Sequence, residues 1–309
     1  MYAMPRALFY ALARSRTLKR MVSKYGMVSQ ESFARRFIAG ETIEEAIEVS
    51  RALQARGLLL TLDHLGESVS TRDDAATAAR EYGWLMEAIV ASGIERNISL
   101  KLTQLGLSID RATCVDNMRR ILDQGQRQGF FVRIDMEASA YTDVTLEIFE
   151  TLWEQQHRNL GIVLQAYLRR TEADVARMNQ LGARVRLVKG AYREPHSIAY
   201  RSKTDVDTSF RRLSRLLIDK GTYPAFATHD PASIEQVRLY ATAQGVTSDR
   251  YEFQMLYGVR RDLQAALVGD GYRMRVYVPF GTQWFPYFMR RLGERPANVA
   301  FVLRSLMHG

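Results

Sequence analysis

The stretch Ile162–Lys189, IVLQAYLRRTEADVARMNQLGARVRLVK, decides the fold class. It begins with a near-continuous apolar run at Ile162–Leu168, continues with helical spacing over Glu172–Leu181, and ends with a second apolar run at Val185–Lys189. Short apolar runs of this kind are typical of strands buried on both faces, and parallel neighbours in a sheet need a helical crossover. The stretch therefore predicts a strand–helix–strand unit of a parallel sheet.

The same unit recurs on both sides of this stretch, because eight apolar runs alternate with helical segments from Leu58 to Val278. The runs are LLLTL (58–62), ISLKL (98–102), FFVRIDM (130–136), IVLQAYL (162–168), VRLVK (185–189), AFAT (225–228), YEFQML (251–256) and MRVYV (274–278), with helices expected at 74–90, 115–128, 145–156, 172–181, 207–217, 234–243 and 261–268. Eight such units predict an α/β fold, a (β/α)8 TIM-like barrel.

Two further helical segments precede the first run, at Ser29–Phe37 and Thr42–Arg56. We expect residues 1–57 to form an N-terminal helical extension and residues 58–309 to form one catalytic barrel that includes the C-terminal helices. The length of 309 residues suits one such barrel, which needs about 250. The absence of a glycine-rich dinucleotide fingerprint and of a P-loop argues against a doubly wound nucleotide-binding fold.

The net charge of +9 favours anionic partners. The basic residues are scattered and match no nucleic-acid-binding signature, so nucleic acid is not expected. The sequence has no apolar stretch of about 18 residues, and its single cysteine, Cys114, suits a reducing compartment. A secretory signal is not expected, because the N-terminal stretch lacks a long apolar core and a small-residue cleavage site. We expect a cytoplasmic protein whose basic N-terminus could contact the inner face of the cell membrane.

Polar residues gather where the predicted strands end, which is where barrel enzymes carry out their chemistry. They are Asp63, His64, Glu67, Lys101, Thr103, Gln104, Arg133, Asp135, Glu137, Gln165, Tyr167, Arg186, Lys189, Thr228, His229, Asp230, Glu252, Gln254, Tyr257 and Tyr277. An excess of lysine and arginine in one barrel mouth is costly unless an anion balances it, so the pattern predicts an anionic ligand. For any single charge, a structural salt bridge between strands is the alternative.

No metal site is expected, because His64, His157 and His229 lie far apart in the sequence and match no standard ligand spacing. His157 is expected in solvent at a helix end, and Cys114 is expected to be a small buried side chain on a helix. No serine lies in a nucleophile elbow.

The C-terminal stretch YVPFGTQWFPYFMRRLGE, Tyr277–Glu294, predicts a strand, a turn at Gly281 and a short helix that carries Arg290 and Arg291. Two guanidinium groups could hold one carboxylate bidentately. Neighbouring helix positions diverge by roughly 100°, however, so this stretch alone favours a basic last turn that suits the helix dipole.

Seven motifs follow one another along the predicted barrel: LKLTQLG, RIDMEAS, VLQAYLRRT, VRLVKGAYREP, FATHD, YEFQMLYGVRRDL and YVPFG…RRLGE. In this order they resemble the proline dehydrogenase family in its monofunctional bacterial form, from about Leu58 to Met307. The resemblance implies oxidation of L-proline to 1-pyrroline-5-carboxylate, the first step of proline catabolism. It also implies FAD as the acceptor of the hydride, a membrane quinone as the next electron acceptor, and a separate pyrroline-5-carboxylate dehydrogenase that uses the product.

The resemblance also implies roles for residues at matching positions. Arg290 and Arg291 match the pair that holds the proline carboxylate, Lys101 matches a third cation there, and Glu294 matches a carboxylate that orients the arginines. Asp135 matches the acid beside the proline nitrogen, which can orient the reacting amine or help move its proton.

Tyr277 matches an aromatic residue that lines the proline pocket, and Arg186 matches an arginine beside the reactive edge of the flavin. The remaining flavin-binding matches are Met136, Gln165, Lys189, Gly190, Ala191, Thr228 and His229. The segment Ser202–Phe210 resembles an element that covers the cofactor. Asp230 departs from the family pattern, in which many relatives have asparagine.

Two other functions fit parts of the sequence. A barrel aldolase could use Lys101 or Lys189 as a Schiff-base lysine, since both lie in predicted strands. A basic binding protein without enzymatic activity is suggested by the net charge alone.

Overall fold

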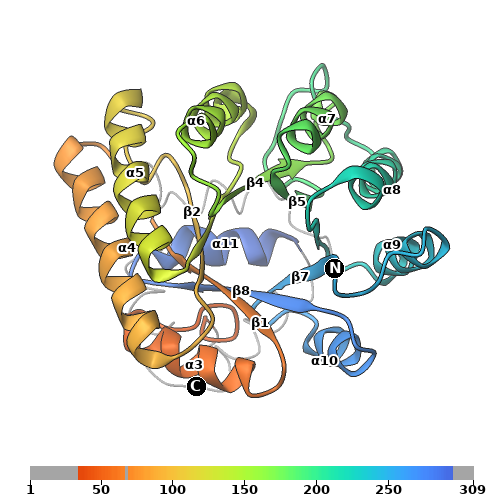
Figure 1. Ribbon diagram of the computed structural model, residues 1–309, viewed down its shortest axis with the longest axis horizontal. Helices are drawn as coiled ribbons and strands as arrows, with labels where there is room; N and C mark the ends of the chain where they lie inside the picture. Colours follow the sequence, from red (N-terminus) through yellow and green to blue (C-terminus); the bar gives the residue numbers. More distant parts are fainter. Residues whose placement is uncertain (1–33, 67–68, 295–309) are drawn as a thin grey trace.

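The computed structural model describes residues 34–66 and 69–294, and its strands close into a barrel (Figure 1). Each strand pairs in parallel with its neighbour in the sequence, and the eighth pairs with the first. The strands are β1 (Leu59–His64), β2 (Asn97–Leu100), β3 (Phe131–Ile134), β4 (Leu160–Gln165), β5 (Arg184–Val188), β6 (Ala225–Ala227), β7 (Glu252–Leu256) and β8 (Met274–Phe280). The prediction of a (β/α)8 barrel is confirmed.

Helices surround the strands in the order expected from the alternation (Figure 1). They are α3 (Ile43–Gln54), α4 (Arg72–Ser92), α5 (Arg111–Gln128), the short 3-10 helix η1 (Ser139–Tyr141), α6 (Thr142–Glu154), α7 (Thr171–Leu181), α8 (Lys203–Lys220), α9 (Pro231–Ala243), α10 (Arg261–Gly269) and α11 (Trp284–Glu294). No helix in these two described ranges is long and apolar enough to cross a membrane.

Local sequence fixes where several helices begin and end. Thr42 caps α3 in a capping box with Glu45, and Asp110 caps α5 by accepting hydrogen bonds from the backbone of its first turn. Gly129 ends α5 in the left-handed conformation, with φ of 74°, which glycine adopts without steric cost.

The amino-terminal end of the barrel interior holds a buried ion pair. Arg275 on β8 donates two hydrogen bonds to Glu252 on β7, from Nε at 2.8 Å and from Nη2 at 2.9 Å. Burial alone would raise the pKa of Glu252, but the charge and hydrogen bonds of Arg275 outweigh it and lower the pKa to about 2. Arg133 lies at the same end and donates to the carbonyl oxygens of Ile162 and Arg184. Arg133 therefore supports the barrel and does not belong to its mouth, contrary to the prediction from strand ends.

Two helices depart from the simple ring. Helix α3 packs against β1, β8 and α4 and so occupies the ring position beside the first and last strands (Figure 1). Helix α11 instead packs its aromatic residues Trp284, Phe285 and Phe288 on Phe37 and Leu65. Because Leu65 follows β1 directly, α11 lies over the carboxyl-terminal end of the barrel.

Some boundaries differ from the predicted ones. Strand β2 ends at Leu100, so Lys101 and Thr103 follow the strand and do not lie in it. Of the predicted helix Ser29–Phe37, residues 34–37 form a turn and the rest lies outside the described residues. Residues 1–33 and the helices expected after residue 294 also lie outside, and the boundary of the extension at residue 57 stays a prediction.

Candidate active site

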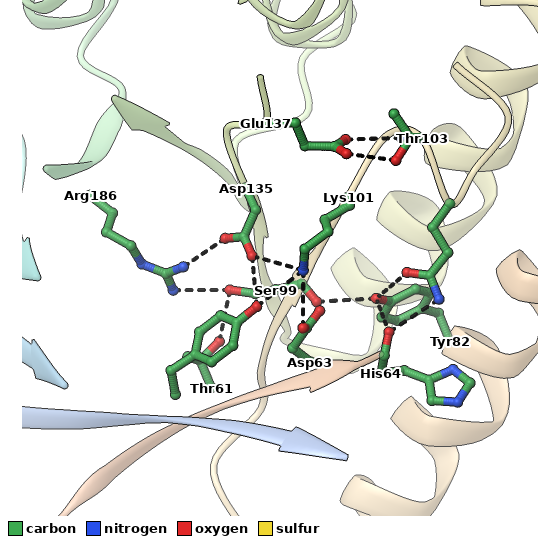
Figure 2. A network of polar contacts seen from close by, with 12 residues as sticks. Thr61, Asp63, His64, Tyr82, Ser99, Lys101, Thr103, Asp135, Glu137 and Arg186 are labelled. Atoms are coloured by element: carbon green, nitrogen blue, oxygen red, sulfur yellow. Dashed lines mark hydrogen bonds and ion pairs between the residues drawn. The ribbon is translucent and has the colours of Figure 1, made fainter. Parts of the chain in front are cut away.

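Side chains from five strands meet at the carboxyl-terminal mouth of the barrel (Figure 2). Asp63 lies near the end of β1, Lys101 and Asp135 directly follow β2 and β3, Arg186 lies in β5, and Tyr277 lies in β8. Far apart in the sequence, these residues are joined by hydrogen bonds and ion pairs of 2.8 to 3.5 Å.

The carboxylate of Asp135 is the centre of this network. Its Oδ1 accepts a hydrogen bond from Arg186 Nη1 at 2.8 Å, and its Oδ2 accepts one from the Tyr277 hydroxyl, also at 2.8 Å. Lys101 Nζ approaches the same Oδ2 at a longer distance of 3.5 Å. Burial, followed by the charge of Asp135, raises the pKa of Tyr277 well above its usual value. Tyr277 therefore stays protonated at neutral pH and acts as a hydrogen-bond donor to Asp135.

Lys101 is held from the opposite side by Asp63. Lys101 Nζ lies 3.1 Å from Asp63 Oδ2 and 3.3 Å from the Tyr277 hydroxyl. Asp63 is completely buried, and this burial raises its pKa, although the nearby charge of Lys101 lowers it in part. The sequence placed Asp63 at a strand end but gave it no role, and its contact with Lys101 marks it as a residue of the site.

Arg186 is fixed by contacts on several of its atoms. Its Nη2 donates to Ser99 Oγ at 2.9 Å, and its guanidinium carbon lies 5.5 Å from the centre of the Tyr277 ring. Ser99 Oγ is in turn 3.3 Å from Thr61 Oγ1 (Figure 2). The buried Nε of Arg186 has no hydrogen-bond partner among the described residues. One donor of this arginine therefore has no acceptor among the described residues.

Buried side chains behind the network hold its loops in place. Tyr82 of α4 donates toward the carbonyl oxygens of His64 and Ser99 and toward Gln104 Oε1, at 3.1 to 3.4 Å. Sequence reasoning missed Tyr82, because it lies in a helix with no polar pattern that points to the mouth. Glu137 accepts hydrogen bonds from the backbone N–H of Thr103 at 3.1 Å and from its hydroxyl at 2.6 Å. These contacts tie the loop after β2 to the loop after β3.

Lys189, a predicted flavin-binding residue, lies just beyond β5 and binds two carboxylates. Its Nζ is 2.6 Å from Asp207 Oδ1 on α8 and 2.9 Å from Asp230 Oδ2 at the start of α9. Burial would raise the pKa of Asp230, but the hydrogen bonds from Lys189 and Ser233 and the charge of Lys189 lower it to about 2. Asp207 lies within the predicted cofactor-covering segment Ser202–Phe210, which is the first part of α8 with Ser202 as its N-cap.

Other predicted flavin-binding residues line the same side of the mouth. Gly190 has φ of 114°, and a Cβ there would lie 2.3 Å from the Tyr167 ring, so only glycine fits. His229 Nε2 accepts a hydrogen bond from the Leu256 backbone at 3.0 Å, so the proton of a neutral imidazole resides on Nδ1. Gln165 is the last residue of β4, Met136 and Thr228 come after β3 and β6, and all three are buried, whereas Ala191 after β5 is exposed.

The predicted carboxylate clamp lies on α11. Arg291 is buried, with its guanidinium carbon 5.0 Å from the centre of the Tyr287 ring. Arg290 is half-buried and lines a cavity of about 440 Å³ together with His64, Gln104 and Tyr287. The side chain of Glu294 lies outside the described part of the structure. The convergence of both arginines on one carboxylate stays a prediction.

The charges in the mouth are balanced more fully than the sequence indicated. Lys101 and Arg186 face Asp63 and Asp135, and Lys189 faces two carboxylates of its own. Among these three basic residues the expected excess of lysine and arginine is not found, because the folded barrel places a carboxylate beside each of them.

The other sequence predictions have simple outcomes. Cys114 is buried on α5, and burial raises the pKa of its thiol to about 12, as expected for a structural side chain. His157 is also buried, contrary to the prediction, and this burial lowers its pKa. In residues 34–66 and 69–294, no group of three or more His, Cys, Asp or Glu side chains is placed to bind a metal ion.

The fold and the polar mouth together define an enzyme of the (β/α)8-barrel class. Comparison with known proteins is more specific, since the family model described as "Proline dehydrogenase" matches residues 46–304. Proline dehydrogenase 1 of Bacillus subtilis (strain 168) is 40% identical over 304 residues, which cover 98% of this chain and 99% of that protein. Proline dehydrogenase of Deinococcus radiodurans is 42% identical over 282 residues, covering 90% and 91%. The chain belongs to the proline dehydrogenase family, and it is an oxidoreductase.

More distant relatives are longer proteins. The bifunctional protein PutA of Escherichia coli is 28% identical over 94% of this chain, which spans only 26% of that relative. The crystal structure of proline utilization A from Bdellovibrio bacteriovorus, inactivated by N-propargylglycine, superposes with a TM-score of 0.80 at 24% identity, covering 93% of this chain and 38% of that one. At this identity the likeness shows a shared fold.

Proposed function

We propose that this chain oxidises L-proline to 1-pyrroline-5-carboxylate with FAD as its cofactor, and that the electrons continue to a membrane quinone. The observation that carries the proposal is the convergence of Lys101, Asp135, Arg186 and Tyr277 at the mouth. Family membership supports the same reaction.

The residues at the mouth fit a flavin. Arg186 has a buried Nε–H with no hydrogen-bond partner among the described residues, and a carbonyl or ring nitrogen of a flavin is a suitable acceptor for it. Lys189, Thr228 and His229 follow β5 and β6 on the adjoining side, where they would hold the rest of the cofactor. When bound, FAD supplies the two-electron acceptor. The positive charge of Arg186 beside it would stabilise negative charge that develops on reduction.

Asp135 is placed to receive the amine of proline. The carbon that is oxidised adjoins the nitrogen, so the nitrogen lone pair must be free and the amine neutral. Of the three donors to Asp135, Lys101 is the most distant, at 3.5 Å, and it also binds Asp63. A substrate amine can therefore replace Lys101 at Asp135 without leaving this lysine unpaired.

The aldolase alternative is disfavoured by the contacts of both lysines. A Schiff-base lysine must lose its proton to act as a nucleophile. Lys101 lies within 3.5 Å of two carboxylates, and Lys189 lies within 2.9 Å of two others. Each amine is instead held by hydrogen bonds to carboxylate oxygens. Neither amine is prepared for nucleophilic attack.

The visible spectrum provides the direct test of this function. The purified protein, or the apoprotein reconstituted with FAD, should show flavin absorbance that bleaches when L-proline is added without oxygen. A protein that fails to take up FAD under these conditions would refute the cofactor assignment. A flavoprotein that proline does not bleach would refute the substrate assignment.

The carboxylate clamp is tested by Arg291→Met, which keeps an unbranched side chain and removes the guanidinium and its charge. A charge-assisted hydrogen bond is worth about 1.5–3 kcal/mol, so KM for proline should rise roughly 10- to 150-fold while bound FAD is retained. Arg211→Met is a matched control, because Arg211 is exposed on α8. Unchanged kinetics for Arg291→Met would remove this residue from the site.

The onward route of the electrons is also part of the proposal. Reduction of a short-chain quinone by proline, in proportion to enzyme, would support quinone as acceptor, and failure with several quinones would oppose it. Sedimentation of the protein with anionic lipid vesicles tests the predicted peripheral contact with the membrane.

The product, 1-pyrroline-5-carboxylate, would be consumed by a separate pyrroline-5-carboxylate dehydrogenase. The cytoplasmic location is a further prediction.

A further inference from the structure

A second cavity lies at the end of the barrel opposite the mouth. It has a volume of about 970 Å³ and is lined by the first residues of several strands, among them Leu59, Asn97, Phe131 and Arg184. Ligand sites in proteins commonly enclose about 300–1,000 Å³. We call this cavity the basic pit, because Arg96, Arg184, Arg250, Arg273 and Arg275 line it against only two acids, Glu95 and Asp249.

Four of these arginines form no salt bridge with a described residue, although Asp249 attracts Arg250 and Arg273 at longer range. Arg275 is neutralised by Glu252 and Glu95, at 2.8 and 2.7 Å. Within the described ranges, no carboxylate lies within salt-bridge distance of Arg96, Arg184, Arg250 or Arg273. Glu95 is already engaged, because it also accepts the Leu60 backbone N–H at 2.6 Å. Like charges gathered around one concave surface repel one another and raise the local potential for anions.

An aromatic frame holds two of the arginines. The guanidinium carbon of Arg184 lies 5.1 Å from the centre of the Phe131 ring and 5.2 Å from that of Tyr223. Arg273 lies 5.6 Å from the Tyr223 ring and donates to the Tyr223 hydroxyl at 3.2 Å. A guanidinium held over a ring can still donate from its N–H edge to an oxyanion, and Arg273 uses only one of its N–H groups on the Tyr223 hydroxyl.

The backbone of Tyr223 is itself unusual. Its φ is 47°, in the left-handed region that an aromatic residue rarely occupies. Its hydroxyl donates to the buried Glu252 at 3.1 Å, which anchors the ring between Arg184 and Arg273. Backbone strain of this kind persists only where surrounding contacts enforce it, and it is concentrated at functional sites. The frame is therefore a rigid one.

From these contacts we infer that the basic pit is a binding site for a compact multivalent anion, one that carries two or more phosphoryl or carboxylate groups. The rings in the pit are covered by guanidinium groups, so the site recognises the oxyanion groups rather than a stacked base. Because the pit and the mouth are at opposite ends of the barrel, binding should not compete with proline. The inference is thus independent of the proposed function.

The test is calorimetric titration of the full-length protein with tripolyphosphate and, separately, with citrate, at about 0.15 M salt, where surface charges are screened beyond about 8 Å. We expect saturable one-to-one binding of at least one of them, and which one binds distinguishes a phosphoryl ligand from a carboxylate ligand. The double variant Arg184→Ala/Arg273→Ala should weaken it at least tenfold. Arg80→Ala, an exposed arginine on α4, should leave it unchanged.

The variant Arg184→Lys distinguishes a site that requires the geometry of the guanidinium group from a surface that attracts anions by charge alone. Lysine preserves the charge but lacks the planar guanidinium that binds an oxyanion bidentately. A site that depends on this geometry should therefore bind the anion more weakly in the variant than in the wild type. Binding that Arg184→Lys leaves intact, or that Arg80→Ala reduces as much as the double variant, would overturn the inference. So would the absence of saturable binding by both anions, or binding confined to polymeric RNA. Circular dichroism of each variant checks its fold.

Discussion

Asp63 offers the sharpest test of the mouth, because its charge should matter for catalysis and little for stability. Asp63→Asn keeps the size of this fully buried side chain and removes its charge. Burial raises the folded-state pKa of Asp63 above the ordinary 3.8, despite the opposing charge of Lys101. An acid whose pKa rises on folding lowers stability at every pH above its unfolded value, and this cost disappears as the pH falls below that value. Asparagine avoids the cost at neutral pH.

The loss of Asp63 does not leave Lys101 alone. Lys101 keeps Asp135 at 3.5 Å and the Tyr277 hydroxyl at 3.3 Å. We therefore expect the free energy of unfolding at pH 7.5 to change by no more than about 1 kcal/mol, in contrast to the roughly 3–5 kcal/mol lost when a buried charge loses its only partner.

Catalysis should respond differently. Without Asp63, Lys101 is held chiefly by Asp135, and the substrate amine must displace a lysine that has no second carboxylate. The lost charge-assisted hydrogen bond is worth about 1.5–3 kcal/mol, which corresponds to a roughly 10- to 150-fold fall in kcat/KM.

Steady-state kinetics with proline measure kcat/KM, and unfolding in urea measures the free energy of unfolding. Asp174→Asn is the matched control, since Asp174 is also buried and ion-paired, with Arg170, on a helix outside the mouth. This control should affect stability without changing kcat/KM. If Asp63→Asn left kcat/KM within twofold of the wild type, or lost activity only in proportion to a large loss of stability, the positioning role of Asp63 would be refuted.

Three further predictions concern single side chains. Tyr277→Phe removes a 2.8 Å hydrogen bond to Asp135 and should lower kcat/KM roughly tenfold with FAD retained, as measured by kinetics and flavin absorbance. Gly190→Ala, at φ of 114° and against a tyrosine ring, should cost at least about 2 kcal/mol in urea unfolding, whereas Gly269→Ala, with open space around it, should not destabilise the protein. The lowered pKa of Glu252 stabilises the fold above pH 4.5, so stability should fall between about pH 4.5 and 2, and Glu252→Gln should lack this acid-dependent step.

The sequence was sufficient to predict the barrel because its eight apolar runs and intervening helices leave few other folds. The first residues of several helices were predicted less accurately from the sequence. Helices α4, α5 and α8 begin two to four residues before the predicted 74, 115 and 207. Their first turns are mainly polar and contribute little to the buried face, so apolar periodicity does not detect them. The N-caps Thr71, Asp110 and Ser202 are the signals that locate these starts.

The residue types of the mouth could also be predicted, but their partners could not. Arg133 and Asp135 alternate onto one face of β3, yet Asp135 reaches Lys101 at the mouth while Arg133 binds carbonyl oxygens deeper in the barrel. Depth along the barrel axis depends on strand tilt and stagger, which no local pattern encodes. Asp63 and Lys101 meet because β1 and β2 are neighbours in the barrel, which brings the end of β1 beside the residue that follows β2.

The balance of charge in the folded mouth changes the argument for an anionic substrate. Lys101 and Arg186 are matched by Asp63 and Asp135, so this network has no net charge that a substrate carboxylate must neutralise. In the proposed function, the attraction for a carboxylate is expected from Arg290 and Arg291 on α11, while the network receives the amine. This division of roles predicts that Arg291→Met weakens the hold on the proline carboxylate, whereas Asp63→Asn hinders the displacement of Lys101 by the proline amine. An unchanged kcat/KM in either variant would contradict it.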